Sequence, residues 1–387
     1  MTRRKLWLGA AFCFVAGDGM AMQTRGALLS SFEETFGVSE SLLGLVAPAG
    51  TVGFVVAILA VGLAAGRLDV RATMLVGAVA MTFAMAVTAI APVYALLLAA
   101  LLAQGAAGGV FRGLDRPLLS HVYPDRLGRI FVLYSLAWSI GAVSGPVVVS
   151  AVLSVADWRL TYLLLAAWFL PVVALLWKLD SPSGWSETEL DRAALSELLG
   201  RPAIRGALAG MALVGGIEGA IFTWLPYYAG TFLERNVANL ALSAYLLAYV
   251  PGRYLYARLV ESGGYLRLAL ATTLLAVPTI ALALVVLSGP AMLLAVFATG
   301  LLISSIFPLL SAYGVEAAPD YSGPVSALTS AATYAGIAVV PTTMGVVAEV
   351  ESIALAMWIP VSLSVALVVV VGATGGRSLL PGARAGG

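Results

Sequence analysis

The sequence predicts an all-α membrane protein with twelve transmembrane helices in two pseudo-symmetric six-helix bundles. Two observations on composition support this. Hydrophobic residues make up 61% of the chain and charged residues only 11%, whereas soluble domains are about half apolar and a quarter charged. The 387 residues also leave room for about a dozen spans of roughly 20 residues with short connections. The third observation is the regular spacing of the apolar segments.

Proline, glycine or charged residues separate these segments, and such residues commonly end helices. We expect helices at residues 6–31, 41–65, 72–91, 94–121, 129–154, 160–178, 206–232, 238–258, 266–287, 290–313, 323–347 and 353–373.

The basic residues predict the orientation. If the N-terminus is cytoplasmic, sixteen of the 21 Lys and Arg residues fall in inner segments, and only Arg159 and Arg235 fall in outer loops. This asymmetry follows the positive-inside rule. We therefore expect a multi-pass protein of the plasma membrane with both termini in the cytoplasm, acting as a monomer.

The longest polar stretch divides the chain into an N-terminal half at 1–180, a cytoplasmic linker at 181–205 and a C-terminal half at 206–387. Within the linker, residues 187–199 have the pattern of a short amphipathic helix. Leu190, Ala194 and Leu198 share one face of it, and Ser186 is the expected N-cap.

Ionisable residues lie deep inside three of the predicted spans. The first span contains Asp18 and Arg25, the fourth contains Arg112, Asp115 and Arg116, and the seventh contains Glu218. Charges are costly in the bilayer interior and face a cavity or a partner there. Asp18 and Arg25 are seven residues apart, so they share a helix face about 10 Å apart.

We interpret Asp18 and Asp115 as candidates for ion coupling, because desolvation favours the protonated carboxyl. The alternative for Asp18 is a permanent salt bridge between helices. Arg25 and Arg112 remain charged and suit a bidentate anion. The alternative for Arg112 is pairing with Asp115, one turn along, and Arg116 is expected to reach the inner surface.

Glu218 has Gly215, Gly216 and Gly219 beside it, which allow close approach of a helix or a solute. Its role could be to accept a hydrogen bond from a sugar hydroxyl, to bind a cation, or to oppose an arginine of the other half. Other side chains could line the pathway, because amides and aromatic rings suit a polar solute. Packing is the alternative for each of them: Gln23, Trp138, Trp224, Tyr228 and Tyr249.

Several classes of function are excluded. Cys13 and His121 are the only residues of their types, which argues against a disulfide or a metal centre. A net charge of +1 argues against a nucleic-acid partner. No phosphate-binding loop is visible, so an ATP-driven pump is not expected. We expect no cofactor, no metal and no enzymatic activity.

The two halves contain similar loops. Residues 62–71 join the second and third spans, and residues 252–267 join the eighth and ninth. We expect gating roles in these loops for Gly62, Arg67, Arg71, Gly252, Arg253 and Arg258. Repeated halves are a known basis of alternating access.

The chain resembles the major facilitator superfamily over essentially its whole length. The 62–71 loop is similar to the family's signature loop, although Gly66 stands where an acid is expected and Asp69 where a glycine is expected. The segment from Gly141 to Pro146 resembles the family's Gly-Pro motif. Residues 216–228, 305–308 and 341–349 are similar to the fucose-permease-type sugar carriers. The two proton-handling acids of those carriers fall at Gly26 and Arg112, which cannot carry the proton.

The resemblance and the buried charges imply a secondary active transporter that works by alternating access and is coupled to protons or another ion. Its partners would be the lipid bilayer, a coupling ion and a small polar solute. An organic anion is favoured over a neutral sugar because of Arg25 and Arg112. The alternatives are an efflux carrier for amphiphilic drugs or lipids, and a non-transporting membrane sensor.

Overall fold

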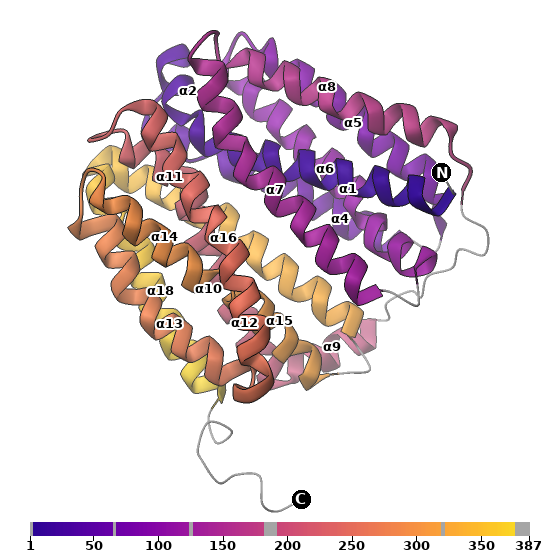
Figure 1. Ribbon diagram of the computed structural model, residues 1–387. Coiled ribbons are helices and arrows are strands. Elements are labelled where there is room, and N and C mark those ends of the chain that lie inside the picture. The colour runs from indigo at the N-terminus through magenta and orange to yellow at the C-terminus, as the bar shows by residue number, and fades with distance from the viewer. Residues whose placement is uncertain (1–2, 65–66, 124–126, 182–191, 319–321, 376–387) are drawn as a thin grey trace, which may run out of the picture. The chain divides into compact units, whose positions relative to one another are not determined.

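The computed structural model describes residues 3–64, 67–123, 127–181, 192–318 and 322–375 (Figure 1). These residues form helices and turns and no β-strand, which confirms the all-α prediction. The chain divides into two compact units. Unit 1 comprises Met1–Glu189 with Arg235–Ser243, and unit 2 comprises Leu190–Glu234 with Ala244–Gly387. The predicted boundaries at 180 and 206 stay a prediction.

Unit 1 contains eight complete helices, coloured indigo to magenta in Figure 1. They are α1 (Arg3–Ala27), α2 (Leu29–Phe36), α3 (Glu40–Leu43), α4 (Val46–Ala64), α5 (Val70–Ala89), α6 (Tyr94–Val122), α7 (Leu127–Leu153) and α8 (Arg159–Lys178).

Unit 2 contains the remaining elements, although the first nine residues of α11 group with unit 1. They are α9 (Arg192–Gly200), α10 (Pro202–Ala229), α11 (Arg235–Leu247), α12 (Tyr249–Gly263), α13 (Tyr265–Ala281), the π-helix η3 (Leu282–Val286), α14 (Ala291–Ile303), α15 (Ile306–Ala317), α16 (Ser322–Val350), α17 (Ile353–Ala356) and α18 (Trp358–Gly375).

Several segments predicted as single helices are broken, and proline explains most of the breaks. The proline ring clashes with the carbonyl four residues earlier and removes one helical hydrogen bond. Four breaks lie three or four residues before a proline, and these prolines are Pro48, Pro251, Pro308 and Pro360. The break at Leu28 has no such proline. Pro146, by contrast, lies inside an uninterrupted α7, so proline alone does not decide a break.

Eleven helical segments of the described chain are long and apolar enough to span a membrane. The predicted eighth span, 238–258, is not among them. It is broken at Ala248 into α11 and α12, of 13 and 15 residues. Pro251 accounts for this break, and Arg253 and Arg258 lower the apolar character of α12.

Each unit packs its helices in the same order, which is the internal repeat predicted from the sequence. In unit 1, α1 packs along α7 and α8, and α5 packs along α6 and α8. In unit 2, α10 packs along α16 and α18, and α13 packs along α14 and α18. The first helix of each unit therefore has equivalent neighbours.

Glycines allow the closest helix pairs to pack backbone against backbone. A Cβ atom on Gly141 of α7 would meet the carbonyl oxygen of Ala16, and one on Gly105 of α6 would meet that of Gly50. In unit 2, a Cβ atom on Gly336 of α16 would meet the carbonyl oxygen of Ala212. Small residues are enriched at such interfaces in membranes because burial of apolar surface drives little association there.

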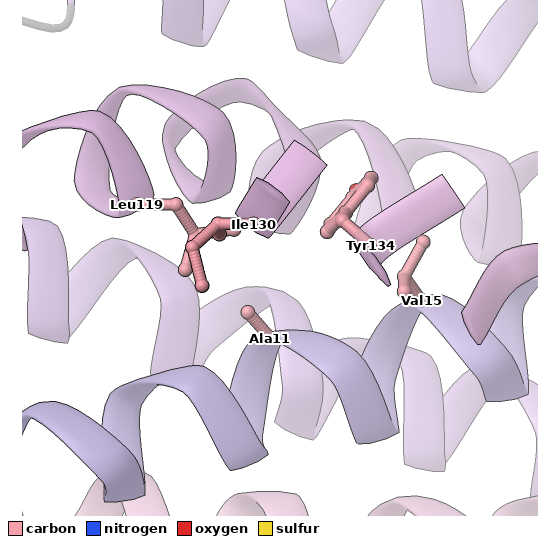
Figure 2. Close-up of a cluster of buried hydrophobic side chains, with 5 residues drawn as sticks. All are labelled: Ala11, Val15, Leu119, Ile130 and Tyr134. Carbon is pink, nitrogen blue, oxygen red and sulfur yellow. The ribbon is translucent and has the colours of Figure 1, made fainter. Parts of the chain in front are cut away.

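A compact cluster joins three helices at one end of unit 1. Figure 2 shows Ala11 and Val15 of α1, Leu119 of α6, and Ile130 and Tyr134 of α7 gathered together. All five are buried. The cluster fixes α1, α6 and α7 relative to one another beside the charged residues described below.

The loop after α4 is anchored to the end of α8. Asp69 caps α5 by accepting the Ala72 N–H at 2.7 Å, and it also accepts the Ser181 hydroxyl at 2.5 Å. Arg71 donates to the carbonyl oxygens of Leu176 and Trp177 at 3.1 and 2.7 Å. Arg71 thus neutralises the negative end of α8. Gly66 of the predicted signature loop lies outside the described residues.

The linker contains the expected helix only in part. Helix α9 covers Arg192–Gly200, while Ser186 and Leu190 lie outside the described residues. Leu198 is fully buried with Ile204, Ala318 and Val325. Arg201 donates to the Ala317 carbonyl at 3.2 Å. This end of the linker is therefore packed into unit 2.

We predict that Gly336→Ala destabilises the protein by about 1–3 kcal/mol, because the added methyl group has no space against α10. The measurement is the thermal unfolding of the purified full chain. Gly372→Ala in α18 is the matched control, since a Cβ atom there meets nothing within 4 Å. Equal unfolding temperatures for the two variants would contradict the packing argument.

We predict that Asp69→Ala costs about 1 kcal/mol through loss of the α5 cap. The hydrogen bonds from Ser181 and the Ala72 N–H lower the pKa of Asp69. Its stabilising effect is therefore complete above the unfolded pKa of about 3.9 and is lost as the pH falls through the lower folded pKa.

Unfolding measured against pH tests this second part. Asp69→Asn keeps a capping oxygen but takes up no proton as the pH falls, so it should remove this acid dependence at a smaller cost in stability at neutral pH. An unchanged acid dependence in Asp69→Asn would refute the assignment.

Candidate functional site

An ion pair lies inside unit 1, in the middle of its membrane-spanning helices. Nη1 of Arg112 on α6 lies 2.8 Å from Oδ2 of Asp18 on α1, and the two side chains are 11% and 16% exposed. The pair joins residues 94 positions apart in the sequence. Of the two alternatives for Asp18, the structure therefore contains the ion pair, and its partner is Arg112.

A glycine and an aromatic ring surround this ion pair. A Cβ atom on Gly108 would lie 3.2 Å from Oδ1 of Asp18. The Arg112 guanidinium carbon lies 5.3 Å from the ring centroid of Phe54 on α4, a cation–π distance. The rings of Phe14 and Phe111 stack with centroids 3.6 Å apart on the same two helices. The charged pair thus lies beside the aromatic ring of Phe54 and is only partly exposed to water, which strengthens its attraction relative to an exposed pair.

Arg25 lies elsewhere in unit 1. Its guanidinium lies over Gly50 of α4, where any added Cβ atom would collide with it. Its Nε is buried and has no hydrogen-bond partner. Tyr162 of α8 and Asp18 act on it electrostatically, but neither forms an ion pair with it. Arg25 is therefore a cation with unused hydrogen-bonding capacity.

Asp115 forms a second polar contact in unit 1, with a different partner from the one considered in the sequence. It is fully buried and accepts the hydroxyl of Tyr134 from α7. Arg112 and Arg116 act on it at longer range. The alternative that Arg112 forms its ion pair with Asp115 is wrong, since the ion pair of Arg112 is with Asp18 of α1. Arg116 is exposed and lies 5.6 Å from the Tyr134 ring centroid.

In unit 2, Glu218 lies within an unbroken buried stretch of α10 from Val214 to Pro226. The hydroxyl of Tyr249 on α12 donates to its Oε1 at 2.6 Å. The hydroxyl of Tyr245 lies 3.1 Å from that of Tyr249. Glu218 is thus held by one neutral hydroxyl group, that of Tyr249.

The other predicted pathway residues have diverse surroundings. Gln23 is fully buried and both of its amide atoms are without a partner. Trp224 is fully buried and donates its indole N–H to the Pro341 carbonyl at 3.0 Å. Trp138 packs against the cluster of Figure 2, and Tyr228 packs edge-on against Phe232. Among these residues, Gln23 is the one whose side-chain amide is free to form hydrogen bonds with a solute.

The predicted gating residues lie at helix ends and packing contacts. Gly62 and Arg67 are exposed beside the end of α4. Gly252 lets α12 approach α14, since a Cβ atom there would meet Ser304 and Leu301. Two arginines of α12 lie over tyrosine rings: Arg253 over Tyr249 at 5.2 Å and Arg258 over Tyr254 at 4.4 Å.

Sequence reasoning missed Phe54, Gly50, Tyr162 and the bond between Tyr134 and Asp115. An aromatic ring or a glycine in a span has no distinguishing neighbour in the sequence, so no local signal could have identified them. Within the described residues no cluster of His, Cys, Asp or Glu could hold a metal ion.

Comparisons with known proteins place this geometry in a family. The model described as "Major Facilitator Superfamily" matches residues 8–341. No curated protein matches the sequence. The similarity to the fucose-permease-type carriers stays a prediction.

Three solved structures of similar fold are named for transporters. The inward-facing, unoccupied structure of a bacterial homologue of the human lysosomal transporter Spinster is 13% identical, with a TM-score of 0.79 and 97% of each chain covered. Its occupied, inward-facing form is 14% identical, with the same TM-score and coverage. A mutant of the nucleoside transporter NupG is 14% identical, with a TM-score of 0.81, covering 96% of this chain and 100% of that one. Structural similarity at such low sequence identity establishes the fold alone. The family is established by the family model, which spans most of the sequence. The chain is thus a multi-pass membrane protein that belongs to the Major Facilitator Superfamily of transporters.

Proposed function

We propose that the protein is a secondary active transporter that moves a small organic anion by alternating access, coupled to protons through Asp18. The observation that carries this proposal is the part-buried ion pair of Asp18 and Arg112, together with a second arginine of the same unit, Arg25, that has no ion pair. Burying a charge pair is a costly way to gain stability. Function is the better explanation for its presence.

The pair suggests how proton and solute are coupled. While Asp18 is ionised, it occupies the Arg112 guanidinium at 2.8 Å. A proton on Asp18 removes its charge and leaves Arg112 able to bind an anionic group of the solute. Proton binding and anion binding then favour each other, and thermodynamic linkage makes this coupling reciprocal. Asp115 is the second candidate acid, because it lies within the electrostatic reach of Arg112.

Arg25 favours an anion over a neutral solute. Its buried Nε lacks a partner, and a guanidinium donates bidentately to carboxylate or phosphate. The unpaired amide of Gln23 can donate to or accept from the same solute. A neutral solute is the competing class, and the nucleoside carried by one structural neighbour is an example of it. Binding of dyes or lipids alone would instead indicate an efflux carrier.

The distribution of basic residues supports the plasma membrane as the site of action, with both termini in the cytoplasm. Loops at 62–71 and 252–267 lie on the cytoplasmic side in this orientation, where Arg67, Arg71, Arg253 and Arg258 flank the spans. We place the gating contacts of the transport cycle there. The protein acts as a monomer in this proposal.

We predict that Asp18→Asn abolishes accumulation driven by a pH gradient in proteoliposomes, because the variant side chain cannot exchange a proton. The solute is first identified by a thermal-shift screen of carboxylates, phosphates, sugars and nucleosides on the purified full chain. Asp157→Asn is the matched control, since Asp157 is exposed and pairs with Arg159. Accumulation that persists in Asp18→Asn would exclude Asp18 as the coupling acid.

We predict that Arg25→Gln weakens binding of the anionic solute by about tenfold to a hundredfold, the loss expected for a charged hydrogen bond of about 1.5–3 kcal/mol. Gly50→Ala should also weaken binding, because the added methyl group displaces the guanidinium. Calorimetry on the purified protein measures both. Arg159→Gln is the control for charge, and undiminished affinity in Arg25→Gln would assign Arg25 a structural role.

A further inference from the structure

Unit 2, like unit 1, has an acid inside its first long helix: Glu218 in α10 and Asp18 in α1. Each acid lies in the second half of the first long helix of its unit, and each helix packs along equivalent neighbours. Glycines flank both acids, with Gly17 and Gly19 beside Asp18 and with Gly219 beside Glu218. Counted from the matching contacts of Ala16 with Gly141 and of Ala212 with Gly336, Glu218 lies one turn further along its helix than Asp18.

The two carboxyl groups differ in their partners. Asp18 has the Arg112 guanidinium of α6 at 2.8 Å. The helices of unit 2 that correspond to α6 are α14 and α15, and they contain neither Lys nor Arg. Among the described residues no cationic atom lies within ion-pair distance of Glu218, and its hydrogen bond comes from the neutral hydroxyl of Tyr249.

The elements around Glu218 supply no closer charge. Helices α9, α15, α16 and α18 pack against α10, and α18 contains no titratable residue. The groups that act on Glu218 are the Tyr249 hydroxyl and, at longer range, the Arg253 guanidinium. The other titratable side chains described on these neighbours do not act on it, namely Glu197, Tyr313, Glu316, Tyr334 and Glu349.

Arg253 does not neutralise Glu218 directly. Its guanidinium carbon lies 5.2 Å from the ring centroid of Tyr249, so the tyrosine ring is the group it lies over. The residue Glu218 is 8% exposed. An ionised carboxylate buried without a paired cation loses its hydration without compensation, and such a group takes up a proton instead.

The hydroxyl groups lie close together beside Glu218. Tyr249 donates its hydroxyl proton to Oε1 of Glu218, and the Tyr245 hydroxyl lies 3.1 Å from that of Tyr249. While Tyr249 donates to Oε1, Oε2 is the carboxylate oxygen left to take up an added proton.

We propose that Glu218 is a second proton-binding site of this protein, carried in unit 2 and neutral in this conformation. Binding adds one proton to the carboxylate oxygen Oε2, and release returns it to water when the transport cycle exposes α10. The proposal goes beyond the coupling assigned to Asp18, and its test below does not depend on transport. In this proposal, Glu218 binds a proton and does not bind the solute.

Infrared difference spectroscopy of the full chain in liposomes tests the proposal. At neutral pH, the wild-type spectrum minus that of Glu218→Gln should contain the C=O stretching band of a protonated carboxylic acid, shifted in deuterium oxide. The same subtraction with Glu316→Gln, an exposed acid of unit 2, should contain no such band. Absence of the band from the Glu218→Gln difference would overturn the proposal.

A second variant protects the test against a folding defect in Glu218→Gln. Tyr249→Phe removes the hydrogen bond to Oε1 and should shift the carboxylic acid band to higher frequency without abolishing it. An unshifted band in Tyr249→Phe would equally overturn the assignment. Neither experiment requires a solute, so a negative result here would leave the proposed transport activity standing. Conversely, failure of Asp18→Asn to affect transport would leave this proposal standing.

Discussion

Ionised groups in the apolar interior of this protein must be paired, hydrogen-bonded or neutral, and the rest of the structure is arranged around that constraint. Hydration is lost inside the spans, so a carboxylate or guanidinium there needs a partner on another helix. Arg112 satisfies this need for Asp18 at 2.8 Å. Glu218 has the Tyr249 hydroxyl instead. Arg25 departs from this rule, since its buried Nε has no hydrogen-bond partner and remains a donor for a solute. These three arrangements differ in what each site can bind.

Glycine packing makes these polar positions possible. Where α1 meets α7 and where α10 meets α16, glycines bring the backbones together. Close backbone contact holds each helix at a defined rotation, which directs Asp18 toward α6 and Glu218 toward Tyr249. Gly50 and Gly108 have the complementary role of leaving space for a charged side chain. Glycine therefore has two roles here: it allows close, rigid helix contacts, and it leaves space for charged side chains.

The internal repeat permits the two units to divide the chemistry. Both use the first long helix to present an acid, yet only unit 1 has arginines on the matching fourth span. A proton on Asp18 would change the charge available to a solute, whereas a proton on Glu218 would change only its own charge. In this scheme unit 1 couples the proton to anion binding, and unit 2 carries a proton without competing for the solute.

The sequence by itself determined the fold class, the approximate spans and the positions of the buried charges, because apolar length and an ionisable residue in a span are local signals. It did not determine helix breaks reliably: Pro251 interrupts its helix while Pro146 does not. Only the tertiary structure decided the partners. The bonds of Arg112 with Asp18 and of Tyr249 with Glu218 join residues 94 and 31 positions apart. Such pairs depend on the rotation and depth of two separate helices, which no local pattern encodes.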